Sequence, residues 1–222
     1  MKRVSFTVLS LLLLAASVKA ETFEIDPNHS KVMFSLRHLV GRVSGLFNKF
    51  EGSFDYVKGK PEAWKTSAKI DAASINTQVE GRDKHLRSKD FFDVEKCPDI
   101  QFTSTKVTDI KGDTAKLHGD LTMHCQTIKD VVLDMEFGGV MEKDQDPMGK
   151  TRAGATATGK IKRSDFGLTY GGAMLGEEVT ISIEVEGLAK EKTAPQNIAE
   201  PKKAAEPKKV AEPKKVVEPK KA

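Results

Sequence analysis

The segment EVTISIEVE, residues 178–186, alternates without a break between apolar and polar side chains. Its odd positions are Val or Ile and its even positions are Glu, Thr or Ser, the pattern of a strand with one buried and one solvated face. Similar alternation recurs in residues 32–38, 50–56, 117–123 and 131–137. Pro-, Gly- and Asp-containing turn signals separate these runs. We therefore expect an all-β protein, an antiparallel barrel or sandwich of about eight strands.

One predicted strand, residues 152–163, has small side chains on one face. That face carries Ala153, Ala155, Ala157, Gly159 and Ile161. If it points inward it leaves volume unfilled, which predicts an internal cavity, because barrels of about eight strands either pack solid or hold one small ligand. The alternative is that bulky neighbours such as Trp64 or Phe166 fill the space. Strand parity places a further set on the same interior: Phe34, Leu36, His38, Phe50, Phe54, Val179, Ile181 and Ile183.

Residues 70–93, IDAASINTQVEGRDKHLRSKDFFD, form a connection much longer than an ordinary hairpin loop. It places polar groups beside large aromatic ones: Arg82, Asp83, His85, Arg87 and Asp90 next to Phe91 and Phe92. This composition fits either the mouth of a ligand site or a helix that plugs one end of a barrel. We expect a short helical segment near residues 78–92 at a barrel end, with the two phenylalanines folded over the interior.

The two ends of the chain differ from its centre. Residues 1–20 have a basic start, an apolar run and small residues before Glu21, as in a secretory signal cleaved after Ala20, which predicts export to the periplasm. The composition changes from residue 189 onward, and EPKK repeats four times within residues 200–221, with a proline in each unit. Residues 189–222 have almost nothing to bury, so we expect a disordered, extended tail. The tail is either a solubiliser or a cationic tether to an anionic envelope surface.

The folded part, residues 21–188, is mildly acidic. The whole chain carries +4, of which the signal contributes three basic residues and the tail ten lysines against five glutamates, so the part between them carries −4. A nucleic-acid-binding domain would have a basic stripe of its own. We expect no nucleic-acid partner.

Catalytic and metal-binding motifs are missing from the sequence. It contains no GxSxG, HExxH, GxxxxGK[ST] or GxGxxG, and its histidines are scattered without metal-ligand spacing. We expect no metal site and no catalytic activity. A hydrolase that uses His38 or His85 is the alternative that would make the protein an enzyme. Parity points Cys125 inward and Cys97 outward on neighbouring strands. We therefore expect two free thiols, unless a break at Pro98 turns Cys97 toward its partner.

An ordered series of motifs runs along the folded part of the chain. The series is Asp26-Pro27-Asn28-His29-Ser30, Gly45-x-Phe47, Phe50-x-Gly52, Ser74-Ile75-x-Thr77, Arg82-Asp83-x-His85-Leu86, Asp90-Phe91-Phe92, Pro98-x-Ile100-x-Phe102, Gly119-x-Leu121-Thr122 and Arg163-Ser164-Asp165-Phe166-Gly167-Leu168. In this order the motifs resemble the YceI family of exported bacterial lipid-binding proteins. The resemblance covers nearly all of residues 21–188. It implies a lipocalin-like antiparallel barrel of eight strands that holds a long isoprenoid chain, without a catalytic step or another cofactor. Family members usually have an aromatic residue at position 97 and a glycine at 125, and the EPKK tail lies outside the family pattern.

The leading hypothesis is a periplasmic carrier of a polyprenyl or quinone tail. The predicted ligand-binding residues are Phe34, His38, Phe47, Phe50, Phe54, Arg82, His85, Phe91, Phe92, Ala155, Ala157 and Phe166. The alternative is a structural envelope protein whose barrel packs solid and whose tail adheres to an anionic surface. A homodimer is compatible with either hypothesis.

Overall fold

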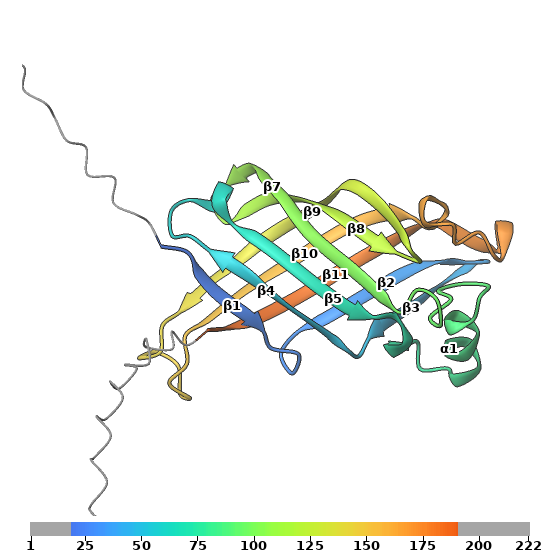
Figure 1. Ribbon diagram of the computed structural model, residues 1–222, viewed down its shortest axis with the longest axis horizontal. Helices are drawn as coiled ribbons and strands as arrows, with labels where there is room; N and C mark the ends of the chain where they lie inside the picture. Colours follow the sequence, from blue (N-terminus) through green and yellow to red (C-terminus); the bar gives the residue numbers. More distant parts are fainter. Residues whose placement is uncertain (1–18, 191–222) are drawn as a thin grey trace, which may run out of the picture. The chain divides into compact units, whose positions relative to one another are not determined.

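A computed structural model describes residues 19–190 (Figure 1). The strands are β1 (Glu21–Ile25), β2 (Lys31–His38), β3 (Gly41–Phe47), β4 (Phe50–Tyr56), β5 (Lys65–Asp71), β6 (Ile75–Asn76), β7 (Asp99–Lys111), β8 (Thr114–Met123), β9 (Gln126–Met141), β10 (Arg152–Lys162) and β11 (Leu175–Ala189). The helices are η1 (Pro61–Ala63), η2 (Ala72–Ser74), α1 (Glu80–Arg87), η3 (Arg163–Phe166) and η4 (Gly172–Met174). No helix within 19–190 is long and apolar enough to cross a membrane. The predicted signal and tail lie outside the described residues, apart from positions 19–20 and 189–190.

The sheet closes on itself because two broken strands complete the ring. β1 pairs with the end of β11, from Phe23 opposite Ala189, and β2 pairs with the earlier part of the same strand. On the other side of these two strands, β3 pairs with β2 and β4 pairs with β1. The other neighbours, β4-β5-β7-β8-β9-β10-β11, follow chain order and are antiparallel. The result is the closed barrel of eight strands with one short helix that the sequence predicts.

The two ends of the barrel are built differently (Figure 1). One end carries α1, the β2–β3 hairpin and the connection between β10 and β11; we call it the mouth. The far end carries η1, the β7–β8 hairpin and the β9–β10 loop. The short helix therefore lies at a barrel end, as predicted, and spans Glu80–Arg87 within the expected segment.

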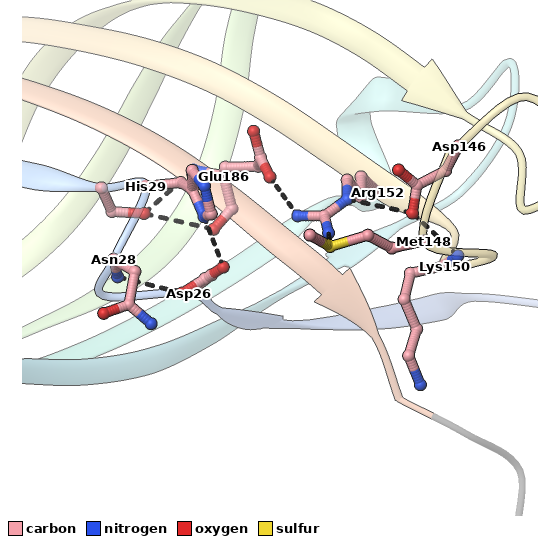
Figure 2. A network of polar contacts seen from close by, with 9 residues as sticks. Asp26, Asn28, His29, Asp146, Met148, Lys150, Arg152 and Glu186 are labelled. Carbon is pink, nitrogen blue, oxygen red and sulfur yellow. Dashed lines mark hydrogen bonds and ion pairs between the residues drawn. The ribbon is translucent and has the colours of Figure 1, made fainter.

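A polar network fixes the bend between β1 and β2 (Figure 2). His29 Nδ1 lies 2.7 Å from Asp26 Oδ2, and the backbone N–H of Asn28 donates to the other carboxylate oxygen of Asp26. Ser30 Oγ accepts from the backbone N–H of Glu186 at 3.0 Å, which fastens the bend to β11. The hydrogen bonds from His29 and Asn28 hold the pKa of Asp26 below its usual value. The Asp26–Ser30 motif is therefore explained by its role in the fold.

The same network continues into the far end of the barrel (Figure 2). Arg152 Nη1 donates to the Glu186 carboxylate at 2.6 Å, and its Nε lies 3.3 Å from Asp146 Oδ2. Burial raises the pKa of Asp146, but hydrogen bonds from the backbone of Lys150 and Met148 and from Arg152 outweigh it, and the net shift is downward. These contacts attach the β9–β10 loop to β10 and β11.

The expectation of two free thiols is wrong, because Cys97 and Cys125 form a disulfide with Cα atoms 5.4 Å apart. Strand parity did not apply, since neither cysteine lies in a strand. β8 ends at Met123, and His124 and Cys125 form a turn with φ values of 50° and 58°. Cys97 precedes the first residue of β7, and its N–H donates to Asp93 O. The bridge joins the loop after α1 to the β8–β9 turn at the mouth.

Candidate functional site

The barrel encloses a cavity of about 450 Å³ with an almost entirely apolar wall. This volume falls within the range of small-molecule sites, about 300–1,000 Å³. All eight barrel positions contribute, because alternate side chains of each strand point inward. The wall includes the inward residues that parity predicts: Phe34, Leu36, His38, Phe50, Phe54, Ala155, Ala157, Val179, Ile181 and Ile183. The cavity agrees with the expected unfilled interior and not with the alternative of a solidly packed barrel.

Three aromatic rings fill the far end of the cavity. Trp64 lies 4.7 Å from Phe137 and 5.4 Å from Tyr56, measured between ring centroids, and Tyr56 stacks on Phe137 at 5.2 Å. Trp64 Nε1 donates to Val57 O at 2.9 Å, so the indole N–H is satisfied although half-buried. All three rings line the cavity. They form an apolar floor opposite the mouth.

The small residues of β10 leave space at only two positions. Ala155 and Ala157 line the cavity. Gly159 does not, since a Cβ at this position would lie 2.5 Å from Leu133 Cδ2, so the Leu133 side chain occupies that space. Ala153 is buried with 2% exposure but lies outside the cavity wall. The prediction that this face lines a cavity therefore holds for Ala155, Ala157 and Ile161, and not for Ala153 or Gly159.

Helix α1 covers the mouth and is attached by polar side chains. Buried Asp83 accepts hydrogen bonds from both the backbone N–H and Oγ1 of Thr77. Arg82 donates to Thr77 Oγ1 at 2.8 Å and to Thr77 O at 2.9 Å. Arg87 donates to Ala73 O and Ile75 O, which attaches the end of the helix to the preceding segment. These contacts hold a helix of only two turns that would not be stable alone.

Aromatic side chains from two connections meet above the cavity. His85 lies edge-on to Phe91 at 5.1 Å and to Tyr170 at 4.9 Å, and Phe91 and Tyr170 are 5.1 Å apart. His85 Nε2 also lies 3.1 Å from Asp90 Oδ2. All three rings line the cavity. Tyr170 was not among the predicted site residues, although it lies only two residues after the Arg163–Leu168 motif.

A buried arginine shapes the connection that presents Tyr170. Arg163, 6% exposed, donates to the backbone carbonyls of Tyr170 at 2.8 Å, Gly176 at 3.1 Å and Gly172 at 3.2 Å, and also to that of Leu168. A guanidinium group has five N–H donors, and Arg163 makes four hydrogen bonds to carbonyl oxygens with them. The connection is therefore held in one conformation from inside.

The structure brings together eleven of the twelve predicted site residues. The cavity wall contains Phe34, His38, Phe47, Phe50, Phe54, Arg82, His85, Phe91, Phe92, Ala155 and Ala157. Phe166 is the exception: it is 1% exposed, lies in η3 and packs in the core outside the cavity wall. Its carbonyl oxygen lies 2.8 Å from His124 Nδ1. Phe166 therefore supports the mouth connection without facing the cavity.

Potential metal ligands gather away from the cavity. Asp26, His29 and Glu186 bring carboxylate and imidazole atoms within 4.8 Å of one another. Asp26 is already bonded to His29, and the Glu186 carboxylate is ion-paired with Arg152. Their existing partners explain this cluster as a structural network.

Residues 23–187 match the YceI-like domain family. The chain belongs to the YceI family. Protein YceI of Salmonella arizonae is 38% identical over 189 residues, which cover 84% of this chain and 96% of that relative.

Solved structures of similar proteins include the YceI protein of Campylobacter jejuni. It is 36% identical, with a TM-score of 0.59, and the match covers 67% of this chain and 86% of that one. A second structure is described as a polyisoprenoid binding domain from Saccharophagus degradans. It is 14% identical with a TM-score of 0.54, and covers 76% of this chain and 98% of that one. At that identity the likeness to this YceI-family chain is one of fold.

Proposed function

We propose that this YceI-family protein binds a long isoprenoid lipid, a polyprenyl chain or the tail of a quinone, inside the barrel and carries it without changing it chemically. The observation that supports this proposal is the cavity of about 450 Å³, which extends from the aromatic floor at Trp64 to the rings at the mouth and is almost free of polar atoms. A protein of similar fold is described as binding polyisoprenoids.

The energetics favour a long apolar ligand. Each buried methylene contributes about 0.8 kcal/mol, so about twenty chain carbons would contribute roughly 16 kcal/mol. Association and ordering cost about 4–15 kcal/mol. A short chain would not overcome this cost in a site with few hydrogen-bonding groups. The cavity therefore favours ligands with a long apolar chain.

The proposed place of action is the periplasm. The basic and apolar pattern of residues 1–20 is that of an export signal. The Cys97–Cys125 disulfide is compatible with this, because disulfides persist in oxidising compartments and are rare in the cytosol.

Filling the cavity tests the proposal. Ala155→Leu and Ala157→Leu place a larger side chain in the cavity wall, while Thr158→Leu adds the same side chain to the exposed face of the same strand. Each variant is titrated with a fluorescent polyprenyl analogue, and folding is followed by thermal melting. We expect both cavity variants to lose at least about tenfold in affinity while Thr158→Leu binds as the parent does. Equal binding by all three folded variants would contradict the proposal.

A further inference from the structure

Large apolar side chains are exposed around the mouth. Of the eight large hydrophobic residues exposed within 19–190, five lie there: Leu39 and Val40 at the β2–β3 hairpin tip, Val79 before α1, and Tyr170 and Met174 in the β10–β11 connection. The backbone N–H of Leu39 donates to Met174 O at 2.8 Å, which joins the hairpin tip to that connection. We call residues 37–42, 79–92 and 167–175 the rim.

The hairpin tip is not explained by the needs of the turn. Leu39 has a φ of 50°, a left-handed conformation in which Asn or Gly is favoured and a bulky apolar residue is uncommon. Its side chain is 51% exposed, and that of the next residue, Val40, is fully exposed. Neither burial nor backbone conformation accounts for two aliphatic residues here. A strained, exposed apolar tip suggests a contact surface.

The charge of the rim is opposite to that of the rest of the barrel. The three rim segments contain six arginines and lysines against three acidic residues, a net +3, whereas residues 21–188 as a whole carry −4. Lys84 and Lys89 are exposed, and the side chain of neither makes a hydrogen bond or ion pair with another described residue. Exposed apolar groups surrounded by cations are the composition of surfaces that lie in the interface of an anionic bilayer.

We propose that the rim docks on an anionic phospholipid bilayer and that lipid passes between the cavity and the bilayer during this contact. This inference rests on the proposed function, and adds to it the bilayer as the partner and the mouth as the route of the lipid. Phe91 and Tyr170 belong to the rim and also line the cavity, so a lipid that enters at the rim remains in contact with apolar side chains. The net positive rim directs the mouth toward the membrane, and the acidic remainder of the barrel is repelled from it.

Two measurements on the full mature chain test this inference. The first is cosedimentation of unloaded protein with vesicles of phosphatidylcholine, with and without phosphatidylglycerol. The second is the rate at which a fluorescent polyprenyl analogue passes from loaded protein to the same vesicles. The test variants are Leu39→Asn with Val40→Ser, which removes the apolar tip, and Lys84→Glu with Lys89→Glu, which reverses the charge. The matched control is Ile110→Ser with Met141→Ser, which removes exposed apolar side chains at the far end.

We expect the transfer rate to rise with vesicle concentration and to fall about tenfold in the tip variant, since burying a Leu and a Val in the interface contributes this much or more. The charge variant should show a weaker preference for phosphatidylglycerol than the parent, and the control should behave as the parent. Analogue affinity and thermal stability should be unchanged in the tip variant, or the stability raised. Because the C-terminal tail is present in every protein, its contribution cancels.

Transfer that is independent of vesicle concentration, or a tip variant that binds and transfers as the parent does, would overturn the inference. A parent protein that is dimeric and a tip variant that is monomeric in ultracentrifugation would assign the rim to a second copy of the chain, and would also overturn it. If no analogue loads at all, the proposed function fails, while cosedimentation still decides whether the rim binds membranes.

Discussion

Phe92 packs edge-on against Phe47, with ring centroids 5.9 Å apart and planes at 87°. Phe47 is the buried last residue of β3, and Phe92 lies in the loop that follows α1. This contact anchors the loop to the barrel wall from inside. Phe91, its neighbour in sequence, instead reaches His85 and Tyr170 at the mouth. Adjacent aromatic residues thus have different surroundings.

Single alanine substitutions should separate these two phenylalanines. Phe91→Ala removes a ring at the mouth, and we expect faster dissociation of a bound polyprenyl analogue with little change in stability. Phe92→Ala removes a half-buried ring that packs against the core, so we expect a loss of stability below the roughly 3–5 kcal/mol of a fully buried phenylalanine. Stopped-flow dissociation and urea unfolding measure the two effects. Parent-like dissociation in Phe91→Ala would show that this ring does not retain ligand.

Breaking the disulfide should loosen the mouth more than the rest of the barrel. In the chain-entropy description, a bridge with a sequence separation of 28 residues stabilises by about 3–4 kcal/mol. The double variant Cys97→Ser with Cys125→Ser should lose stability of this order and release analogue faster, since the loop carrying Phe91 is no longer attached to the β8–β9 turn. Hydrogen exchange should rise in residues 88–98. Uniform exchange along the chain would contradict a local role.

Strand positions could be predicted from the sequence, but contacts between connections could not. Alternation placed Phe34, Ala155 and Ile181 on one interior because the period of a strand fixes which face a side chain takes. Phe166 was misplaced because it lies in η3, where no strand period applies. Tyr170 reaches the mouth only because Arg163 holds the connection between β10 and β11.

The disulfide was missed for a related reason. Parity was extended past the ends of β7 and β8 into the loop and turn that hold Cys97 and Cys125. The departure of both positions from the family pattern was a usable signal, because two unusual cysteines that arise together in an exported chain favour pairing.

The pH dependence of stability should reflect Asp26 and Asp146. The pKa of each carboxyl is lowered in the folded protein, so each contributes stability that is present above its usual pKa of 3.8 and is lost as the pH falls through its folded value. Unfolding midpoints should therefore drop more steeply below about pH 4 in the parent than in Asp26→Asn with Asp146→Asn. Parallel curves for the two proteins would show that these carboxyls do not contribute.

Removing the tail should leave the barrel intact. β11 continues through Ala189, and the backbone N–H of Lys190 donates to Thr22 O at 2.9 Å, so the deletion should begin at Glu191. We expect unchanged thermal stability and analogue affinity. If the tail is a cationic tether, the truncated protein should bind phosphatidylglycerol vesicles less at low salt. Unchanged binding to these vesicles would contradict a tethering role and favour the alternative that the tail is a solubiliser.

Native mass spectrometry of the protein exported and purified from a bacterial periplasm, followed by lipid extraction, tests most directly whether the cavity holds an isoprenoid. We predict a mass adduct that persists in Thr158→Leu, is reduced in Ala155→Leu, and yields a polyprenyl or quinone lipid on extraction. A protein that is free of adduct, and that takes up no polyprenyl lipid when it is supplied, would contradict the proposal.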